Sequence, residues 1–396
     1  MSAARTIIVA GAGIGGLTAA LALAQKGLRV ALLDKAEKLE QTGAGIQLSP
    51  NATRVLIGLG LRAALLPSIV VPEAVVIRTA RGRDVARLPL GKGAAARYGA
   101  PYWIIHRADL QAALLAAATA HPDITLTLGA AVEACATQSD GVAVQVRRGD
   151  GVSEMRGDAL VGADGLWSRV RTLVGETDMP RFGRRAAWRA LVPADRVAPE
   201  LRAPAIQLWL GAGAHLVHYP VKTGAMINIV AIARDEAPSA GWSTAATPAE
   251  VLARFPRERW ARAAHDVLSM PAQWLKWPLY DRAPRPLHRK GAVTLLGDAA
   301  HPMLPFVAQG AAMAIEDAAV LAALLAPVPD DLAAAMRRYE QARAPRTARV
   351  QRVARRNDTI YHLAWPASAL RDLAMGGLGN ARLRGQHDWI YGWRPD

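Results

Sequence analysis

The chain has 396 residues and carries 48 Lys and Arg against 33 Asp and Glu, which gives a formal net charge of +15. Hydrophobic residues make up 52% of it, so the chain can bury a large core, and its length favours two domains. The positive charge comes mostly from scattered arginines, not from basic runs interleaved with aromatic residues. This disfavours nucleic-acid binding and favours either anionic small molecules or a basic composition with no binding role.

A glycine-rich stretch lies close to the start of the chain. Residues 11–16 are Gly-Ala-Gly-Ile-Gly-Gly, and they follow an apolar run over 6–10 and precede a helical pattern over 17–26. This order predicts a strand, a tight turn and a helix. The N-terminus of such a helix offers free N–H groups and a partial positive charge to phosphate groups. The stretch is therefore predicted to bind the phosphates of a dinucleotide, with an ordinary surface loop as the alternative.

Three glycines and one acid in this region have distinct expected roles. Gly11 would permit the tight turn, Gly13 would let the backbone approach a pyrophosphate, and Gly16 would let the helix pack closely against the strand. A second apolar run ends in Asp34, where a carboxylate would accept hydrogen bonds from a ribose. The combination predicts an adenine dinucleotide and leaves FAD and NAD as alternatives.

The segments that follow depart from a regular alternation of strands and helices. Residues 74–80 and 84–90 alternate in polarity and predict a hairpin, which is expected to belong to a second domain. Residues 102–106 predict a strand, and an alanine-rich helix is predicted over 107–120. Arg107 stands at the entrance of this helix, where it would hold a phosphate group.

The middle of the chain is rich in predicted strands. Residues 141–147 are expected to pair with residues 152–156, and a buried strand ends at Asp164. Between residues 186 and 234 four strand patterns follow one another without crossover helices, which predicts a largely antiparallel sheet. Helical patterns follow over residues 248–265.

The alternation of strand and helix returns towards the C-terminus. A strand over 292–296 is followed by Gly-Asp-Ala-Ala-His-Pro at 297–302, and helices are predicted over 310–325 and 332–355. The arginines of the last helix are expected to form a solvated face. Residues 357–396 are too few for a further domain and are expected to cover the core or form a dimer contact.

Cysteine content and hydropathy exclude several classes of protein. Cys135 is the only cysteine, which excludes an internal disulfide and a multi-cysteine metal site, and no metal is expected. The sequence begins without the basic and apolar segments of a signal peptide. No apolar run reaches the roughly 18 residues of a membrane span. We therefore expect a cytoplasmic protein that contacts neither a membrane nor nucleic acid.

Three separated motifs resemble the fingerprints of the single-component, FAD-dependent aromatic hydroxylases, the class A flavoprotein monooxygenases. They are the glycine turn ending in Asp34, residues 162–171 (Gly-Ala-Asp-Gly-Leu-Trp-Ser-Arg-Val-Arg), and residues 297–302 continued by Gln309 and Gly310. Within that family, residues 45–51 and 215–220 resemble the branch of salicylate hydroxylase, 3-hydroxybenzoate 6-hydroxylase and 6-hydroxynicotinate 3-monooxygenase. The resemblance extends over roughly residues 7–349.

The resemblance implies a fold and a domain organisation. It implies an α/β fold in which a Rossmann-like FAD-binding domain carries an inserted, mainly antiparallel β-sheet substrate domain, as in p-hydroxybenzoate hydroxylase, and C-terminal helices. The expected segments are 1–70, 100–180 and 285–350 for the discontinuous FAD-binding domain, 71–99 and 181–284 for the substrate domain, and 351–396 for the C-terminal helices.

The resemblance also implies roles around FAD. Asp34 would hold the adenosine ribose, although glutamate is commoner there, Arg107 the ribityl and phosphate region, and Asp298 a ribityl hydroxyl. The backbone at residues 310–312 would face the flavin, where a helix N-terminus stabilises negative charge. Asp164 would bridge the flavin site and the approach of NADH. The complete set of expected cofactor-binding residues is Gly11, Gly13, Ile14, Gly15, Gly16, Asp34, Lys35, Gly45, Arg107, Val132, Asp164, Asp298, Pro305, Gly310, Ala311 and Ala312.

The implied reaction is hydroxylation of a small aromatic ring through a flavin hydroperoxide. The chain shows no second dinucleotide-binding turn, and members of the family use NADH or NADPH as a transient electron donor together with molecular oxygen. The peroxide must be shielded from water, and the phenol of the substrate must be oriented to lose its proton. A monomer or a homodimer is expected.

His215, Tyr219 and Gln309 are the expected catalytic residues. His215 and Tyr219 are four residues apart on a predicted strand and therefore share a face. By the resemblance both contact the substrate, His215 as a base or hydrogen-bond acceptor and Tyr219 at a carboxylate or ring nitrogen. Gln309 would hydrogen-bond the substrate above the flavin. A structural histidine, a packed tyrosine and a capping glutamine are the alternatives.

Other residues and other chemistries stay open at this point. Pro305 would turn its carbonyl towards the substrate, and His301 is expected to hold its loop in place. Arg189 would pair with a substrate carboxylate or, at a sheet edge, be solvated. The alternative functions are a flavin reductase or halogenase of the same fold and a non-catalytic flavin- or ligand-binding protein.

Overall fold

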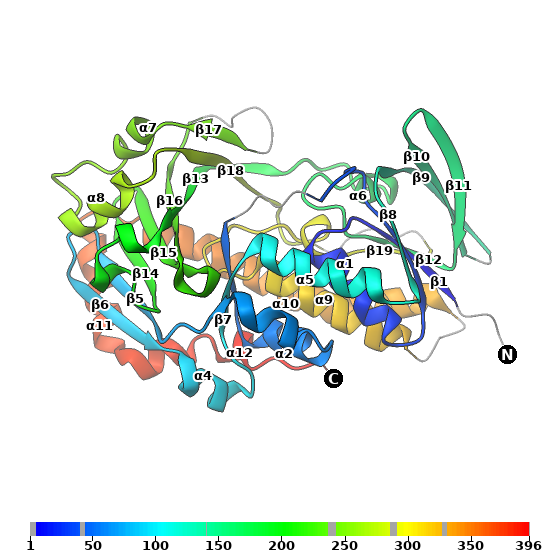
Figure 1. The fold of residues 1–396 in the computed structure, drawn as a ribbon, viewed down its shortest axis with the longest axis horizontal. Helices are drawn as coiled ribbons and strands as arrows, with labels where there is room; N and C mark the ends of the chain where they lie inside the picture. The colour runs from blue at the N-terminus through cyan, green and yellow to red at the C-terminus, as the bar shows by residue number, and fades with distance from the viewer. Residues whose placement is uncertain are drawn as a thin grey trace.

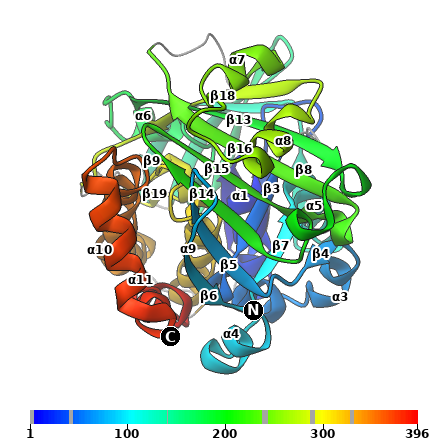
Figure 2. The same cartoon turned by 90° about the vertical axis from the view of Figure 1, so that its left-hand side faces the viewer.

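The computed structural model describes residues 5–39, 44–139, 141–236, 243–285, 291–326 and 331–395. A parallel sheet with its helices occupies one end of the molecule, and a larger antiparallel sheet occupies the other (Figure 1). Figure 2 looks onto the larger sheet and shows the C-terminal helices along one side of it. The two sheets are therefore placed so that a cavity can form between them.

Five parallel strands form the sheet at one end, in the order β19-β12-β1-β2-β8. Their bounds are β1 (Thr6–Ala10), β2 (Arg29–Leu33), β8 (Ile124–Thr127), β12 (Ala159–Gly162) and β19 (Val293–Leu295). The runs are almost wholly apolar because both faces of the sheet are covered. On the face of Ile7 and Val9 the covering helices are α1 (Ile14–Ala24), α5 (Arg107–Ala120) and α9 (Gly310–Leu325).

The opposite face of this sheet is covered by a small antiparallel sheet and a short helix. The small sheet contains β9 (Ala130–Gln138), β10 (Gly141–Arg148) and β11 (Gly151–Gly157), and the helix is α6 (Arg169–Leu173). The pairing of β10 with β11 is the predicted one. Together the layers confirm the predicted Rossmann-like α/β arrangement.

Eight strands form the larger sheet, in the order β17-β18-β13-β16-β15-β14-β5-β6. Their bounds are β5 (Ala74–Thr79), β6 (Asp84–Pro89), β13 (Arg181–Pro193), β14 (Ile206–Gly211), β15 (Ala214–Val221), β16 (Met226–Arg234), β17 (Thr244–Ala246) and β18 (Trp274–Asp281). All neighbours are antiparallel except β14 and β5. This confirms the mainly antiparallel sheet, and the predicted hairpin joins it as an edge.

One part of this region differs from the sequence prediction. The helical patterns over 248–265 correspond to two short helices, α7 (Pro248–Leu252) and α8 (Arg262–Ser269), the second of which extends beyond the predicted range. Pro256 lies between them, and a proline lacks the N–H group and sterically opposes helix continuation. The strand β18 that follows was not predicted, and it supplies one wall of the cavity described below.

A third sheet and the remaining helices complete the fold. The sheet has the order β3-β7-β4, with β3 (Gly45–Leu48), β4 (Ile69–Val70) and β7 (Trp103–His106). The helices are α2 (Pro50–Gly58), α3 (Arg62–Leu65), α4 (Gly91–Tyr98), α10 (Leu332–Tyr361), α11 (Ala367–Gly385) and α12 (Asp388–Tyr391). Side chains of α11 pack with β5, β6 and β14, so the C-terminal segment covers the outer part of the larger sheet. Among the described helices none is both long and apolar enough to cross a membrane.

Three arginines of α10 differ from the predicted solvated face, whereas the others described as exposed agree with it: Arg337, Arg338, Arg349, Arg352 and Arg356. The side chain of Arg343 is 4% exposed, and it contacts Glu316 at 2.8 Å and Asp317 at 2.6 Å. Arg346 reaches both oxygens of Glu316, and Arg355 pairs with Asp281. The helix also ends at Tyr361, six residues beyond the predicted end at position 355. Its last turns are stabilised by contacts with distant segments, which helical periodicity does not reveal.

Replacement of Arg343 tests how strongly this buried cluster holds the fold. Arg343→Ala leaves two buried carboxylates with one cation fewer, and removal of one partner of a buried ion pair costs about 3–5 kcal/mol. We expect the free energy of unfolding, measured by urea titration, to fall by that amount. Arg338→Ala, at an exposed position of the same helix, should change it by no more than about 0.5 kcal/mol. Equal effects of the two substitutions would contradict the conclusion that the buried ion pairs of Arg343 stabilise the fold.

Candidate active site

The carboxyl ends of β1 and β12 meet at the glycine turn. Gly11 has φ +106°, and a Cβ atom there would lie 2.4 Å from the carbonyl oxygen of Ala163. A Cβ atom on Gly16 would lie 1.8 Å from the carbonyl oxygen of Gly11. Both contacts are far too short for a side chain, so only glycine lets the turn fold against its neighbour. A Cβ atom on Gly15 would lie 2.8 Å from Cδ2 of Leu296, a less close approach and one to a side chain.

Gly13 differs from the other glycines of the turn. Its backbone is extended, and a Cβ atom on it would meet no atom within 4 Å. The residue caps α1, whose first N–H groups have no partner within the helix. The space beside Gly13 therefore adjoins free N–H donors and the positive end of a helix dipole, which is a binding place for phosphate.

Two cavities adjoin at this turn. One, of about 260 Å³, lies towards the end of β2, and the other, of about 400 Å³, lies between the parallel and antiparallel sheets. Gly13, Ala163 and Gly165 line both of them. The arrangement fits an extended dinucleotide, with its adenosine in the smaller cavity, its pyrophosphate at the turn and its isoalloxazine ring in the larger cavity.

The smaller cavity contains several of the predicted cofactor residues. Asp34, Lys35, Val132 and Asp164 all line it. One oxygen of Asp34 accepts from the N–H of Ala12 at 2.6 Å and the other from the N–H of Ala36 at 2.9 Å. Each oxygen keeps a second lone pair, so a ribose hydroxyl can still donate to this carboxylate.

The structure gives Asp164 a local role in addition to its place on the cavity. Its carboxylate accepts from the hydroxyl of Ser168, from the N–H of Arg169 at 2.7 Å and from the N–H of Val170 at 3.0 Å. These bonds hold the start of α6. The expected contact with FAD and with the approach of NADH stays a prediction.

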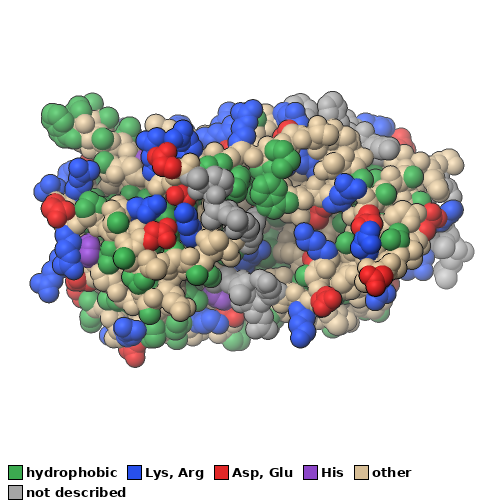
Figure 3. Space-filling view, turned by 90° about the horizontal axis from the view of Figure 1, so that it is seen from above, with side chains coloured by type: hydrophobic (Ala, Val, Ile, Leu, Met, Phe, Trp, Pro, Cys, Tyr) green, Lys and Arg blue, Asp and Glu red, His purple; other side chains and the backbone are tan. Residues whose placement is uncertain are grey.

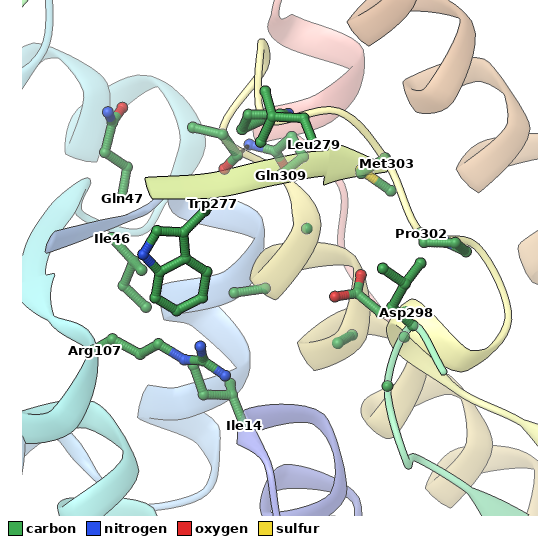
Figure 4. Close-up of a pocket in the computed structure, with 18 of the residues that line it drawn as sticks. Ile14, Ile46, Gln47, Arg107, Trp277, Leu279, Asp298, Pro302, Met303 and Gln309 are labelled. Atoms are coloured by element: carbon green, nitrogen blue, oxygen red, sulfur yellow. Dashed lines mark hydrogen bonds between the residues drawn. The ribbon is translucent and has the colours of Figure 1, made fainter. Parts of the chain in front are cut away.

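The larger cavity brings together residues from many separate parts of the chain. Arg107 from the start of α5 and Asp298 from a 3₁₀ turn lie on different sides of it, and Trp277 of β18 lies on the side of Arg107 in the view of Figure 4. Enclosure by the surrounding protein raises the pKa of Asp298, although its side chain is accessible from the cavity. The guanidinium of Arg107 forms no ion pair or hydrogen bond with the described residues, which leaves it free for a phosphate or ribityl group.

The N-terminus of α9 opens onto the same cavity. Gly310, Ala311 and Pro305 line it, and a Cβ atom on Gly310 would meet nothing within 4 Å. Ala312 is fully buried in the core behind them and does not line the cavity with its side chain. Ile14, Gly15 and Gly45 complete the predicted cofactor residues on its walls.

Three rows of side chains lie on the face of the larger sheet that borders the cavity. In register across β15, β16 and β13 these rows are His215–Ile232–Ala187, Val217–Val230–Arg189 and Tyr219–Asn228–Leu191. His215, Tyr219 and Arg189 all line the cavity, so the predicted sharing of one face is observed. Arg189 lies on β13 inside the sheet and not at its edge, contrary to the solvated alternative.

His215 is held from behind by another histidine. Its Nδ1 lies 2.8 Å from Nε2 of His362, while its own Nε2 makes no hydrogen bond to the described residues. The ring is 2% exposed and packs edge-on against Phe306 and Tyr361. Burial, together with the neighbouring charges of His362 and Arg185, lowers the pKa of His215 well below its usual range, so the ring is neutral.

Tyr219 and Gln309 are engaged in contacts that join parts of the fold. The hydroxyl of Tyr219 donates to the carbonyl of Gly45 at 2.7 Å, and burial raises its pKa to about 12. The amide of Gln309 donates to Ser49 at 2.9 Å and accepts from Asn51 at 3.1 Å, and it does not cap α9. Both residues line the cavity, and their contacts with a substrate stay predictions.

Sequence reasoning missed several residues of this site. His362 was not considered, because it is 147 positions from His215 and no local motif marks it. Trp277 belongs to the unpredicted strand β18, and its ring lies beneath the guanidinium of Arg189 at 5.1 Å. Nε2 of His301, by contrast, lies 2.6 Å from Oδ2 of Asp317. This contact agrees with the structural role that was expected of His301.

The fold, the glycine turn and the adjoining cavities define a dinucleotide-binding flavoprotein. Residues 4–356 match the family described as FAD binding domain. The chain belongs to this family, and within it to the FAD-dependent aromatic hydroxylases, which are monooxygenases, as full-length relatives show.

Two curated relatives and one solved structure illustrate the likeness. The chain is 39% identical to 3-hydroxybenzoate 6-hydroxylase 1 of Aquipseudomonas alcaligenes, over 98% of this chain and 97% of the relative. It is 38% identical to 3-amino-4-hydroxybenzoate 2-monooxygenase of Streptomyces cremeus, over 98% and 94%. A salicylate hydroxylase substrate complex superposes with a TM-score of 0.84 at 26% identity, covering 100% of this chain and 97% of that one.

Gly13 provides a test of where the cofactor lies. Gly13→Ala should leave the thermal stability of the FAD-free protein unchanged, because the new methyl group meets no protein atom. The methyl group would occupy space needed by the pyrophosphate. Such overpacking costs about 1–3 kcal/mol, which weakens FAD binding about 5- to 150-fold. Flavin fluorescence titration measures this, with Gly58→Ala at an exposed helix end as the control. Unchanged FAD affinity would place the pyrophosphate elsewhere.

Proposed function

We propose that this enzyme uses NADH or NADPH and molecular oxygen to hydroxylate a small aromatic ring that carries both a hydroxyl and a carboxylate group. Salicylate, hydroxybenzoates and hydroxynicotinates belong to this class. The observation that carries the proposal is the cavity face of the larger sheet, where a neutral histidine and an unpaired arginine lie within reach of one ring-sized molecule. The printed names of the relatives support the same class of substrate.

The spacing of His215 and Arg189 supports a substrate with two polar ends. His215 lies on β15 and Arg189 on β13, with β16 between these two strands, and the two residues are offset by two positions along the strand direction. With strands about 4.8 Å apart and about 3.4 Å per residue, their Cα atoms are about 12 Å apart. Val217, Val230 and Ile232 line the cavity around them, so an aromatic ring would lie on an apolar surface with one polar contact at each end.

Arg189 is the proposed partner of the carboxylate. Its Nε atom is buried without a hydrogen-bond partner, and its guanidinium forms no ion pair with the residues that the structure describes. Burial lowers the pKa of Arg189 from its usual value, and the nearby Arg107 adds to this effect, which shows how poorly its charge is compensated. A buried cation without a counter-ion favours binding of an anion.

His215 is the proposed acceptor of the phenol proton. A neutral, cavity-facing imidazole nitrogen can accept a hydrogen bond from a phenol and then its proton. Tyr219 and Gln309 would position the ring from the two neighbouring sides. When bound, FAD supplies the electron transfer and the activation of oxygen. We assign its adenosine ribose to Asp34, its ribityl chain to Arg107 and Asp298, and its ring to the backbone at 310–312.

An activity assay tests the class of substrate. FAD-loaded protein should oxidise NADH or NADPH faster with salicylate, 3-hydroxybenzoate or 6-hydroxynicotinate than alone, and hydroxylated product should form with little release of hydrogen peroxide. Benzoate, which lacks the hydroxyl, should not be hydroxylated, because the ring is not activated. Oxidation that is independent of every ring compound and yields only peroxide would contradict the proposal and indicate a flavin reductase or oxidase.

Substitution of Arg189 tests the carboxylate contact. Arg189→Met should raise KM for the hydroxylated carboxylate by about 30-fold or more, since loss of one partner of a buried charge pair costs about 2–5 kcal/mol. Turnover of phenol, which has no carboxylate, should not change. Arg189→Lys should recover part of the loss, and Arg196→Met, at an exposed position nearby in sequence, is the matched control. Equal changes for the acid and for phenol would rule out a carboxylate-specific role.

A further inference from the structure

His215, His362 and Asp358 form a connected chain from the cavity towards the surface, which we call the histidine relay. His215 contacts His362 at 2.8 Å. Nδ1 of His362 lies 2.6 Å from the backbone carbonyl oxygen of Asp358 and 3.1 Å from its Oδ1. The side chain of His362 is 3% exposed, whereas that of Asp358 is 24% exposed. The three residues therefore lead from a buried base to a carboxylate in contact with solvent.

The hydrogen bonds determine where the protons lie. A carbonyl oxygen can only accept, so Nδ1 of His362 must carry the proton that it shares with Asp358. With that proton on Nδ1, Nε2 of His362 can accept from Nδ1 of His215. Neutral His215 is consequently left with its lone pair on Nε2, the nitrogen that makes no bond to the described protein. The relay thus fixes His215 in the tautomer that a base facing the cavity requires.

Burial makes it unfavourable for the His215 ring to hold a second proton. Its ring is enclosed by Phe306 and Tyr361, and the charge of Arg185 on β13 faces it as well. Asp358, at the other end, is paired with Arg185. Burial opposes its ionised form, but the hydrogen bond with His362 and the charge of Arg185 outweigh this and lower the pKa of Asp358. A positive charge is therefore more stable beside the carboxylate of Asp358 than on His215, which faces the cavity.

In the described part of the chain, the other polar groups around the relay offer no competing path. Burial raises the pKa of Tyr361 to about 12, so its hydroxyl stays neutral. Arg371 donates to the carbonyls of Ile360 and Tyr361 and is itself paired with Asp372. Arg185 also donates to the carbonyl of Gly213, beside the relay. These contacts fix the end of α10 and leave Asp358 as the nearest proton-accepting side chain to His362.

We propose that His362 and Asp358 conduct the phenol proton of the substrate from His215 to the surface of the protein. The phenol proton binds Nε2 of His215 as the Nδ1 proton of His215 passes to Nε2 of His362. The Nδ1 proton of His362 passes in turn to the carboxylate of Asp358 and from there to solvent, because the ion pair with Arg185 favours the ionised carboxylate. The reverse transfers protonate the phenolate of the product and restore the starting tautomers, so no proton is gained or lost. This proposal rests on the function proposed above.

The first test does not require turnover. In FAD-loaded protein with ¹⁵N-labelled histidine, the imidazole nitrogen shifts should show both His215 and His362 with the proton on Nδ1. Histidine-to-glutamine variants assign the signals. A proton on Nε2 of His215 in the resting protein would overturn the relay whatever the substrate proves to be.

The second test measures proton removal. On mixing the FAD-loaded protein with a hydroxybenzoate, stopped-flow absorbance reports formation of the bound phenolate. His362→Gln and Asp358→Asn should slow this step more than tenfold, with substrate affinity retained. Their kcat should also rise with pH where that of the unmodified protein is flat, because hydroxide must replace the missing acceptor. A merely structural role would change affinity but not the pH dependence.

A matched control separates the possible outcomes. Nδ1 of His387 also contacts a backbone carbonyl four residues earlier, that of Leu383 at 3.3 Å, but it has no contact with His215. His387→Gln should therefore behave like the unmodified protein. Normal phenolate formation and an unchanged pH profile in His362→Gln would refute the relay. A lack of hydroxylation by the unmodified protein with every ring compound would instead refute the proposed function, while the tautomers still test the relay.

Discussion

Two buried carboxylates on α9 hold the elements that surround the larger cavity. Glu316 and Asp317 are fully buried, and Arg343 and Arg346 approach them from α10 as ion-pair partners. Asp317 also accepts from the N–H of Gly297 at 2.9 Å, which fixes the turn that carries Asp298. Burial opposes ionisation of Asp317, but His301 and Arg343 outweigh this and lower its pKa. One charged cluster thus positions loops that line the larger cavity.

The two sheets supply different parts of the site. The parallel sheet ends in short, glycine-containing turns whose backbone approaches are too close for any side chain, which suits the binding of a long dinucleotide. The antiparallel sheet provides a broad face whose side chains alternate between core and cavity, which suits the recognition of a small ring. Tyr219 joins the two parts, because its hydroxyl, on β15, donates to Gly45 of β3.

The sequence predicted those features that depend on local backbone requirements. Gly11 and Asp34 belong to a short motif whose spacing follows from one turn, and both line the smaller cavity. Features that depend on packing between distant segments could not be predicted in this way. The pairing of Arg343 and the contact of His362 with His215 arise because α10 crosses behind the cavity. No pattern within α10 distinguishes such an arginine or histidine from a solvated one.

The electrostatics of the cavity explain why a proton exit would matter for this chemistry. A substrate carboxylate would offset the charge of Arg189, and the ring would then need to become more electron-rich to react with an electrophilic oxygen. A phenolate is richer than a phenol, but an imidazolium left on His215 would draw electron density back through its hydrogen bond. Moving that proton to Asp358 would leave the phenolate with a neutral donor instead. The same step would avoid a buried cation on a ring whose pKa burial has already lowered.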